Sequence, residues 1–202
     1  MIISHKYRFI FIKTLKTAGT SIEVFLSQHC GPLDVVTPIL PHAEPHVPRN
    51  HDGYFNHIHA ADIRSRVPLE VWRTYFKFCV ERNPWDKTLS YYHMMNFRNG
   101  GGLSFDQFLE GDDFPVNYPK YTDPSDAKRV IVDRVLSYER LTEDLGRVFR
   151  ELGIPFHGSL GVNAKSEFRT DRRPYREVYT PAQAYRVATI FAEERRLHGY
   201  AF

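Results

Sequence analysis

Three short apolar runs, each followed by a helical pattern, determine the architecture that the sequence predicts. The runs cover residues 7–13 (YRFIFIK), 74–81 (TYFKFCVE) and 134–139 (RVLSYE). Their aromatic and β-branched residues, without internal breakers, are typical of buried strands. Because strands that alternate with helices form parallel sheets covered on both faces, we predict a three-layer α/β fold with a central parallel sheet.

Breakers and helical spacing delimit the helices. The first helix follows residue 19, with Thr20 or Ser21 as its expected N-cap, and ends before the Gly31-Pro32 pair. The next major helix begins at Pro84, a residue that fits the first helical turn. Other helices are expected around residues 59–67, 104–110, 142–152 and 181–197, whereas residues 38–53, rich in proline and histidine, are expected to be irregular.

Composition adds few constraints but excludes several classes of protein. The 202 residues are 42% hydrophobic and 25% charged, which predicts a single globular domain over residues 1–202. A net charge of +3 suits an anionic ligand but is far below that of a nucleic-acid-binding domain. Two cysteines form no disulfide framework, and no membrane span or signal peptide is evident, so a cytoplasmic location is expected.

The loop after the first run has the features of an anion site. The sequence KTLKTAGTS links the expected strand to the expected helix. It therefore places the backbone amides of residues 18–21 near the N-terminus of that helix, where they and the helix dipole can bind an anion. Gly19 permits close backbone approach, and Lys16 adds a positive charge. The spacing G-x-x-x-x-G-K-[ST] of nucleotide triphosphatases is absent, and a surface lysine beside a capped turn is the alternative interpretation.

A second candidate segment, FCVERNPWDKTLSYY, follows the strand at residues 74–81. Arg82 lies at the strand end and Ser90 lies two turns into the next helix, so both side chains can reach one phosphate group. The alternative is that Arg82 pairs with Asp86 and that Ser90 is an ordinary helix residue.

Together, these two segments resemble the sulfotransferases that use 3′-phosphoadenosine 5′-phosphosulfate (PAPS). FIKTLKTAGTSIE is similar to their 5′-phosphosulfate loop, PKTAGTS, and ERNPWDKTLSYY is similar to their 3′-phosphate element. The resemblance continues in SYERLTEDLGRVFRELGI and in VYTPAQAYRVATIFAEERRLHGYAF, as in the carbohydrate-type, heparan- and chondroitin-like members. It covers most of the chain and implies the P-loop-like fold of that family.

The resemblance implies a set of donor-binding residues and two departures from the family pattern. The set is Lys16, Thr17, Ala18, Gly19, Thr20, Ser21, Arg82, Ser90 and Tyr138, the last of these against the adenine. Leu15 stands where the family usually has proline, which we expect to loosen the loop backbone. Lys87 stands where arginine is frequent, and we expect it at a helix surface.

The segment NHIHAADIR supplies candidate bases for the reaction. Imidazole titrates near neutral pH, so a histidine suits deprotonation of a hydroxyl group. The segment resembles the H-x-H element of heparan-type sulfotransferases, which implies His59 as general base and His57 as a supporting catalytic residue. The alternatives are two loop histidines, or a metal site that includes the nearby His42, His46 and His51.

The resemblance therefore predicts transfer of a sulfuryl group from PAPS to an acceptor hydroxyl, with release of adenosine 3′,5′-bisphosphate (PAP) and without a metal. The expected acceptor is a carbohydrate, a glycolipid or a small molecule. The basic segment 165–176, with an excess of three positive charges, is a candidate contact for donor or acceptor. The alternatives are a P-loop kinase for nucleotides or small molecules and a catalytically silent nucleotide-binding module.

Overall fold

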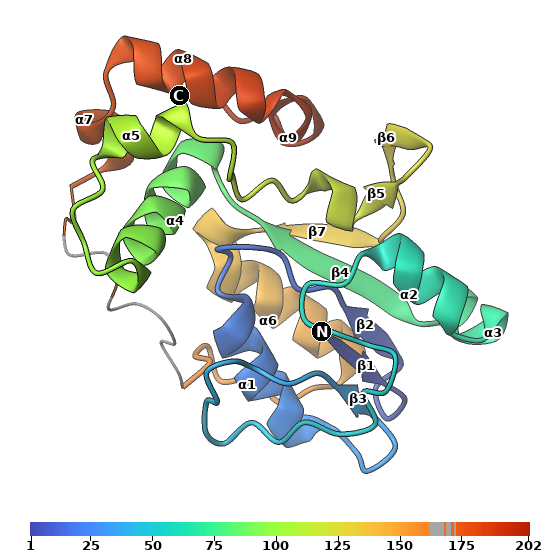
Figure 1. Ribbon diagram of the computed structural model, residues 1–202. Helices are drawn as coiled ribbons and strands as arrows, with labels where there is room; N and C mark the ends of the chain where they lie inside the picture. Colours follow the sequence, from blue (N-terminus) through green and yellow to red (C-terminus); the bar gives the residue numbers. More distant parts are fainter. Residues whose placement is uncertain (162–167, 169–170, 172) are drawn as a thin grey trace.

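A mixed five-stranded sheet forms the centre of the computed structural model, which describes residues 1–161, 168, 171 and 173–202 (Figure 1). Its strands, in spatial order, are β3 (Val35–Val36), β1 (Ile2–Ser4), β2 (Phe9–Phe11), β4 (Phe76–Glu81) and β7 (Arg134–Ser137). Strands β2, β4 and β7 are parallel, whereas β1 runs antiparallel to both β2 and β3. The predicted parallel sheet is thus confirmed for three strands and is extended by two that were not predicted.

Alternating side chains give this sheet two buried faces. Phe9 and Phe11 belong to the core on one face, together with α1 (Gly19–His29) and α6 (Leu141–Leu152). Ile10 and Ile12 belong to the core on the other face, which includes residues of α2 (Ala60–Arg66). Successive residues of a strand point to opposite faces, so a continuous apolar run indicates a strand buried on both sides. The three-layer architecture is therefore confirmed.

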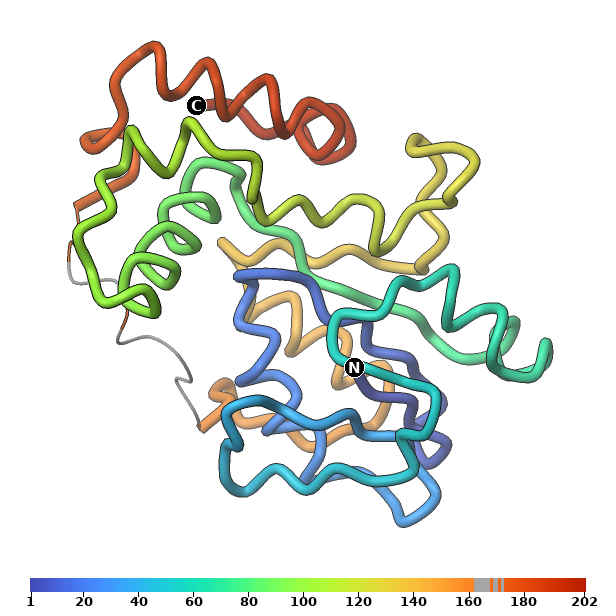
Figure 2. Tube along the Cα trace, viewed as in Figure 1, coloured from blue at the N-terminus to red at the C-terminus, as the bar shows by residue number. Residues whose placement is uncertain are grey.

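Most of the remaining helices form the upper part of the molecule as drawn in Figure 1, and two short strands form a small second sheet. Helix α4 (Pro84–Arg98) packs against α8 (Pro181–Ile190), which also contacts α5 (Phe105–Glu110). Figure 2 shows the C-terminal helices, in red, running above the green segment of α4 and α5. The other elements are α3 (Leu69–Thr74), α7 (Tyr175–Val178), α9 (Ala192–His198), the antiparallel pair β5 (Thr122–Asp123) and β6 (Asp126–Val130), and two 3₁₀ turns at Tyr118–Lys120 and Tyr138–Arg140.

Two differences from the predicted elements have local causes. The first apolar run forms only the three-residue β2, because the chain before it turns at Arg8, whose φ is 56°, to pair with β1. The predicted helix over residues 181–197 is divided into α8 and α9 at Phe191, whose backbone leaves helical geometry (φ −98°, ψ 30°). No helix formed by the described residues combines the length and apolarity needed to cross a membrane.

Candidate functional site

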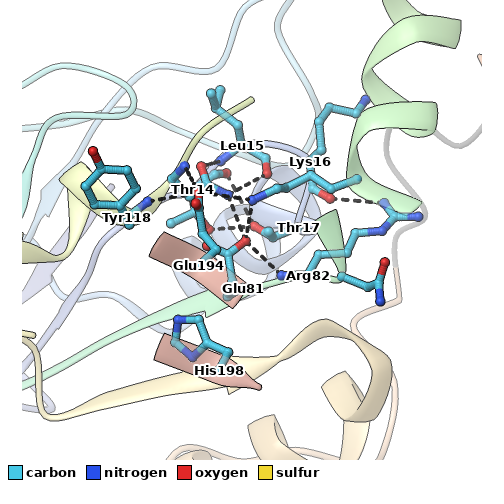
Figure 3. Close-up of polar contacts among 12 residues, drawn as sticks. Thr14, Leu15, Lys16, Thr17, Glu81, Arg82, Tyr118, Glu194 and His198 are labelled. Carbon is cyan, nitrogen blue, oxygen red and sulfur yellow. Dashed lines mark hydrogen bonds and ion pairs between the residues drawn. The ribbon is translucent and has the colours of Figure 1, made fainter. Parts of the chain in front are cut away.

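The parallel pairing of β2 and β4 brings the two predicted donor-binding segments together. Both strands end at the same edge of the sheet, and the chain after each one enters the site. The Thr14 hydroxyl donates to the carbonyl of Val80 near the end of β4. Nη1 of Arg82 donates to the carbonyl oxygen of Lys16 at 3.0 Å, a contact drawn in Figure 3. Residues 66 positions apart, one from each of the two segments, are therefore in direct contact.

The loop between β2 and α1 leaves the start of the helix without a side-chain cap. Lys16 and Ala18 both have a φ of 59°, in the left-handed region. Ala18 occupies the N-cap position, makes no side-chain cap bond, and is followed by a first turn without acidic residues. The prediction that Thr20 or Ser21 caps the helix is wrong, because the helix begins earlier, at Gly19. The first amides of an uncapped helix, together with the helix dipole, attract an anion.

Gly19 is required for a reason that the sequence did not reveal. A Cβ atom on this residue would lie 2.7 Å from Cγ of Lys13, which is too close for two carbon atoms. The Lys13 side chain cannot easily move, because its buried amine donates to Glu23 at 2.5 Å. The absence of a side chain at Gly19 therefore lets the aliphatic part of the Lys13 side chain pack against the start of α1. Lys13 anchors the loop, and the conformation of residues 14–18 is built on this contact.

The hydroxyl groups of the loop differ in their availability. Thr17 is buried, and its hydroxyl lies 2.7 Å from that of Thr14 and 3.3 Å from the Thr14 carbonyl, so its bonds are within the loop. Thr20 and Ser21 are buried in the first turn of α1. Donation to a ligand from this loop therefore depends chiefly on backbone amides, whereas the predicted donor role of the Thr17 hydroxyl would require these internal bonds to change.

Lys16 extends from this loop toward α4. Its amine lies 3.5 Å from Sδ of Met94 and 5.8 Å from the centroid of the Phe168 ring. The Phe168 ring also packs on Phe97 with 5.1 Å between centroids. The Lys16 amine thus lies beside a thioether and near an aromatic face, on the side of the loop that faces α4.

Arg82 combines a structural contact with spare donor capacity. Its Nε and Nη2 atoms donate to one oxygen of Asp86 at 2.9 and 2.6 Å, so the ion pair considered as an alternative is present. Its guanidinium carbon lies 4.1 Å from the centroid of the Tyr138 ring, and it therefore covers one face of that ring. The guanidinium has five N–H groups, of which these contacts and the bond to the Lys16 carbonyl use three. Ser90, half-buried, lies two turns into α4.

The two candidate bases are placed differently. His57 has a φ of 61°, and its Nδ1 lies 3.1 Å from the carbonyl oxygen of Lys13, directly beside the loop. Because a carbonyl oxygen only accepts, Nδ1 carries the proton and Nε2 is the acceptor. Burial and the nearby charges of Lys13 and Lys120 lower the pKa of His57 to about 3. His57 is therefore neutral at pH 7.

His59 is the N-cap residue of α2, but its side chain makes no cap bond. Burial lowers the pKa of His59, and the charge of Lys120 lowers it further, whereas Asp62 opposes the shift. A neutral imidazole at pH 7 is the form that a general base needs.

Lys120 is a residue of this region that the sequence did not single out. It ends the 3₁₀ turn Tyr118–Lys120 before β5, and its amine donates to the carbonyl of His57 at 3.3 Å. Burial lowers the pKa of Lys120 as well. Within the described parts of the chain, no carboxylate forms an ion pair with it. Lys120 therefore adds positive charge beside the two histidines; a lone lysine in an irregular stretch gives no sequence signal.

The expectation that Lys87 lies at a helix surface is wrong. Instead of lying at a helix surface, its side chain is completely buried, and its amine lies 2.7 Å from Oε1 of Glu81 and 3.7 Å from Oε1 of Glu194. Burial raises the pKa of Glu194, whose other oxygen, Oε2, has no hydrogen-bond partner among the residues that the structure describes. A buried lysine is stable only when paired, and both of its partners come from elsewhere in the chain.

Two further predictions concern charged or metal-binding groups. Much of the basic segment 165–176, including Lys165, Arg169 and Arg172, lies outside the described residues; Arg173, which is described, pairs with Asp171 at 2.7 Å. Among the residues that the structure describes, no three His, Cys, Asp or Glu side chains are grouped so as to hold a metal ion.

The chain is similar to an archaeal protein in sequence and to a solved structure in fold. No family profile matches the sequence. An uncharacterized protein of Archaeoglobus fulgidus is 36% identical over 108 residues, which are 52% of this chain and 90% of the archaeal protein. The crystal structure of mouse sulfotransferase SULT7A1 complexed with PAP superposes with a TM-score of 0.54 at 15% identity, covering 98% of this chain and 87% of the mouse chain. The chain thus has a sulfotransferase-like α/β fold and belongs to the same family as the uncharacterized archaeal protein.

Proposed function

We propose that this protein is a PAPS-dependent sulfotransferase whose single domain transfers a sulfuryl group to an acceptor hydroxyl. The observation that carries the proposal is the uncapped start of α1 beside Lys16 and Arg82, at the shared edge of parallel strands β2 and β4. Amides, a lysine and an arginine are the donors that phosphate and sulfate groups prefer. The fold shared with a PAP-bound mouse sulfotransferase supports the same assignment.

The residues divide into a donor side and an acceptor side. On the donor side, the amides at the start of α1 hold the 5′-phosphosulfate, and Arg82, with Ser90, holds the 3′-phosphate. Tyr138 offers the adenine the ring face that Arg82 does not cover. On the acceptor side, His57, His59 and Lys120 surround the reacting hydroxyl. A glycan or glycolipid is the first acceptor class to assay.

The transfer itself requires a base and a stabilised leaving group. His59 accepts the hydroxyl proton while the acceptor oxygen forms a bond to sulfur, and the bond from sulfur to the phosphate oxygen breaks. Lys16 stabilises the negative charge that develops on that phosphate oxygen, so PAP leaves as the bisphosphate and the acceptor becomes a sulfate ester. Catalysis of this kind rests on positioning and electrostatic stabilisation.

The pH dependence of the reaction is expected to identify the base. Since only neutral imidazole accepts a proton, kcat/KM should fall as the pH decreases through the pKa of the base. The pKa of His59 is lowered from 6.5, so we expect a plateau at pH 7 and a decline at a pH below 6.5. A His59→Gln variant should lose at least about a hundredfold in rate together with this decline. A decline near pH 3 in the wild type would instead assign the base to His57, whose pKa is about 3.

Ligand binding tests the donor assignment independently of the acceptor. In isothermal titration calorimetry, we expect the protein to bind PAP without added magnesium and to bind magnesium-ATP much more weakly. The Arg82→Ala variant should bind PAP about 10- to 100-fold more weakly, because charge-assisted hydrogen bonds are lost. Arg134→Ala is the matched control, since Arg134 lies at the opposite end of β7 and pairs with Glu151.

The outcomes of this experiment separate the alternatives. Preference for magnesium-ATP would identify a kinase and refute the proposal. PAP binding without transfer of labelled sulfate to any member of a broad hydroxyl panel would indicate a silent binding module. Equal PAP affinity of Arg82→Ala and wild type would exclude Arg82 as the 3′-phosphate ligand.

A further inference from the structure

The backbone of Leu15 is held by a side chain from a distant segment. Oδ1 of Asn117 accepts from the Leu15 amide at 2.7 Å, and Nδ2 of Asn117 donates to the Leu15 carbonyl at 3.0 Å. We call these two hydrogen bonds the Asn117 clamp. Its direction is fixed, because a reversed amide group would set two donors against each other at the Leu15 N–H. Leu15 directly precedes Lys16, so the clamp holds the base of the reactive loop.

Asn117 is itself held in one orientation by buried charges. It is fully buried; its Nδ2 also donates to Oε1 of Glu81 at 3.2 Å, and its backbone amide donates to Oε1 of Glu194 at 2.9 Å. Lys87 bridges these two carboxylates. Figure 3 shows Glu81 and Glu194 beneath the loop that carries Leu15 and Lys16. Strand β4 thus contacts the Asn117 side chain, α9 contacts its backbone amide, and Lys87 of α4 links the two carboxylates.

The clamp also explains how the chain accommodates Leu15. A proline has no N–H group, so it could not donate to Oδ1 of Asn117. A proline at this position would restrict the backbone through its ring. Leucine instead donates a backbone hydrogen bond to the buried side-chain amide of Asn117. The expectation that Leu15 loosens the loop is therefore wrong: the loop backbone is fixed by an external clamp.

We propose that Asn117 is a positioning residue, which holds the Leu15–Lys16 backbone so that Lys16 and the helix-start amides face the donor. This role rests on the proposed sulfotransferase function, but the clamp itself does not. Asn117 touches neither donor nor acceptor in this role; it acts through Leu15. Its removal deprives the partly buried N–H and C=O of Leu15 of these two bonds, a state in which the loop opens more often.

A double-mutant cycle in the full-length protein tests the clamp. Hydrogen–deuterium exchange of the peptide spanning residues 13–20 should be at least about tenfold faster in Asn117→Ala than in wild type. Leu15→Pro removes one bond of the clamp and should accelerate exchange at residues 16–18 in the wild-type background, but add little to Asn117→Ala. Asn96→Ala is the matched control, because Asn96 also accepts from a backbone amide, that of Leu103, at 2.9 Å.

PAP titration and kinetics then connect the clamp to the site. We expect Asn117→Ala to weaken PAP binding and to lower kcat by at least about tenfold, whereas Asn96→Ala does neither. Wild-type exchange rates at residues 13–20 in a folded Asn117→Ala variant would overturn the clamp, as would additive effects of the two substitutions. If Asn117→Ala does not fold, Leu15→Pro alone decides: unchanged exchange at residues 16–18 would refute the clamp. Failure of the wild type to bind PAP would refute the proposed function and leave the exchange result valid.

Discussion

Lys16→Ala is expected to lower kcat for sulfuryl transfer by about 10²- to 10³-fold, the usual cost of removing a group that stabilises transition-state charge. PAP affinity should change by less than about tenfold, because the amides of the loop and Arg82 remain. The Lys16 side chain is only partly buried. Substitution of such a residue outside the core usually changes stability little, so the melting temperature should stay within about 2 °C of the wild type.

The comparison variant is Lys6→Ala. This substitution removes a lysine that precedes α1 in the chain and whose amine lies at the opposite, C-terminal end of that helix. The Lys6 amine donates to the carbonyl of His29 at 2.9 Å, at the C-terminus of that helix. Its removal should leave kcat unchanged. If Lys16→Ala keeps more than a tenth of wild-type kcat while Lys6→Ala is also active, Lys16 does not stabilise the leaving group.

Replacing Lys87 by methionine is expected to cause a large loss of stability. The substitution keeps the length of the side chain but leaves Glu81 and Glu194 as buried carboxylates without their cation. Breaking a buried pair in this way costs about 3–5 kcal/mol of unfolding free energy. For a protein of this size, the melting temperature should fall by roughly 6–20 °C.

The loss in Lys87→Met should depend on pH. Burial already raises the pKa of Glu194, and loss of the amine raises it further, so a protonated carboxyl group becomes the tolerated form. Stability is lost as the pH rises through the raised pKa, so the variant should be less destabilised at pH 5 than at pH 8. Arg147→Met, which breaks an exposed pair with Glu143, should cost at most about 1 kcal/mol at either pH. A similarly small cost for Lys87→Met would show that the buried pair contributes little.

The elements that the sequence predicted well are those with strong local signals. Helix α4 begins at Pro84 with Asn83 as its cap, and α6 ends at Gly153 in the left-handed conformation, as the breakers indicated. Strands β1 and β3 have only three and two residues, too few for a periodic pattern. Strand β1 is placed in the sheet by its pairing with β2, and β3 by its pairing with β1, rather than by their own sequences.

The residues of the candidate site also fall into two groups, those with a local sequence signal and those without one. Lys16 and Arg82 were predicted because each follows an expected strand, and His57 was predicted because its segment resembles an H-x-H element. Asn117 and Lys120 could not be predicted, because they lie in an irregular segment and reach the site only through tertiary contacts. Lys87 was misjudged because helical position alone cannot show that two carboxylates, one of them 107 residues away, meet its amine.

The left-handed residues on either side of Thr17 affect which substitutions the loop can tolerate. Lys16 and Ala18 share a φ of 59°, whereas Thr17 does not lie in the left-handed region. Where left-handed residues alternate with right-handed helical ones, successive N–H groups face one concave side, a backbone arrangement termed a nest. A nest binds anions through main-chain atoms, which every substitution keeps so long as the dihedral angles survive. Directed evolution of this protein should therefore tolerate exchange of small side chains at residue 18 more readily than rearrangement of the supports beneath the loop.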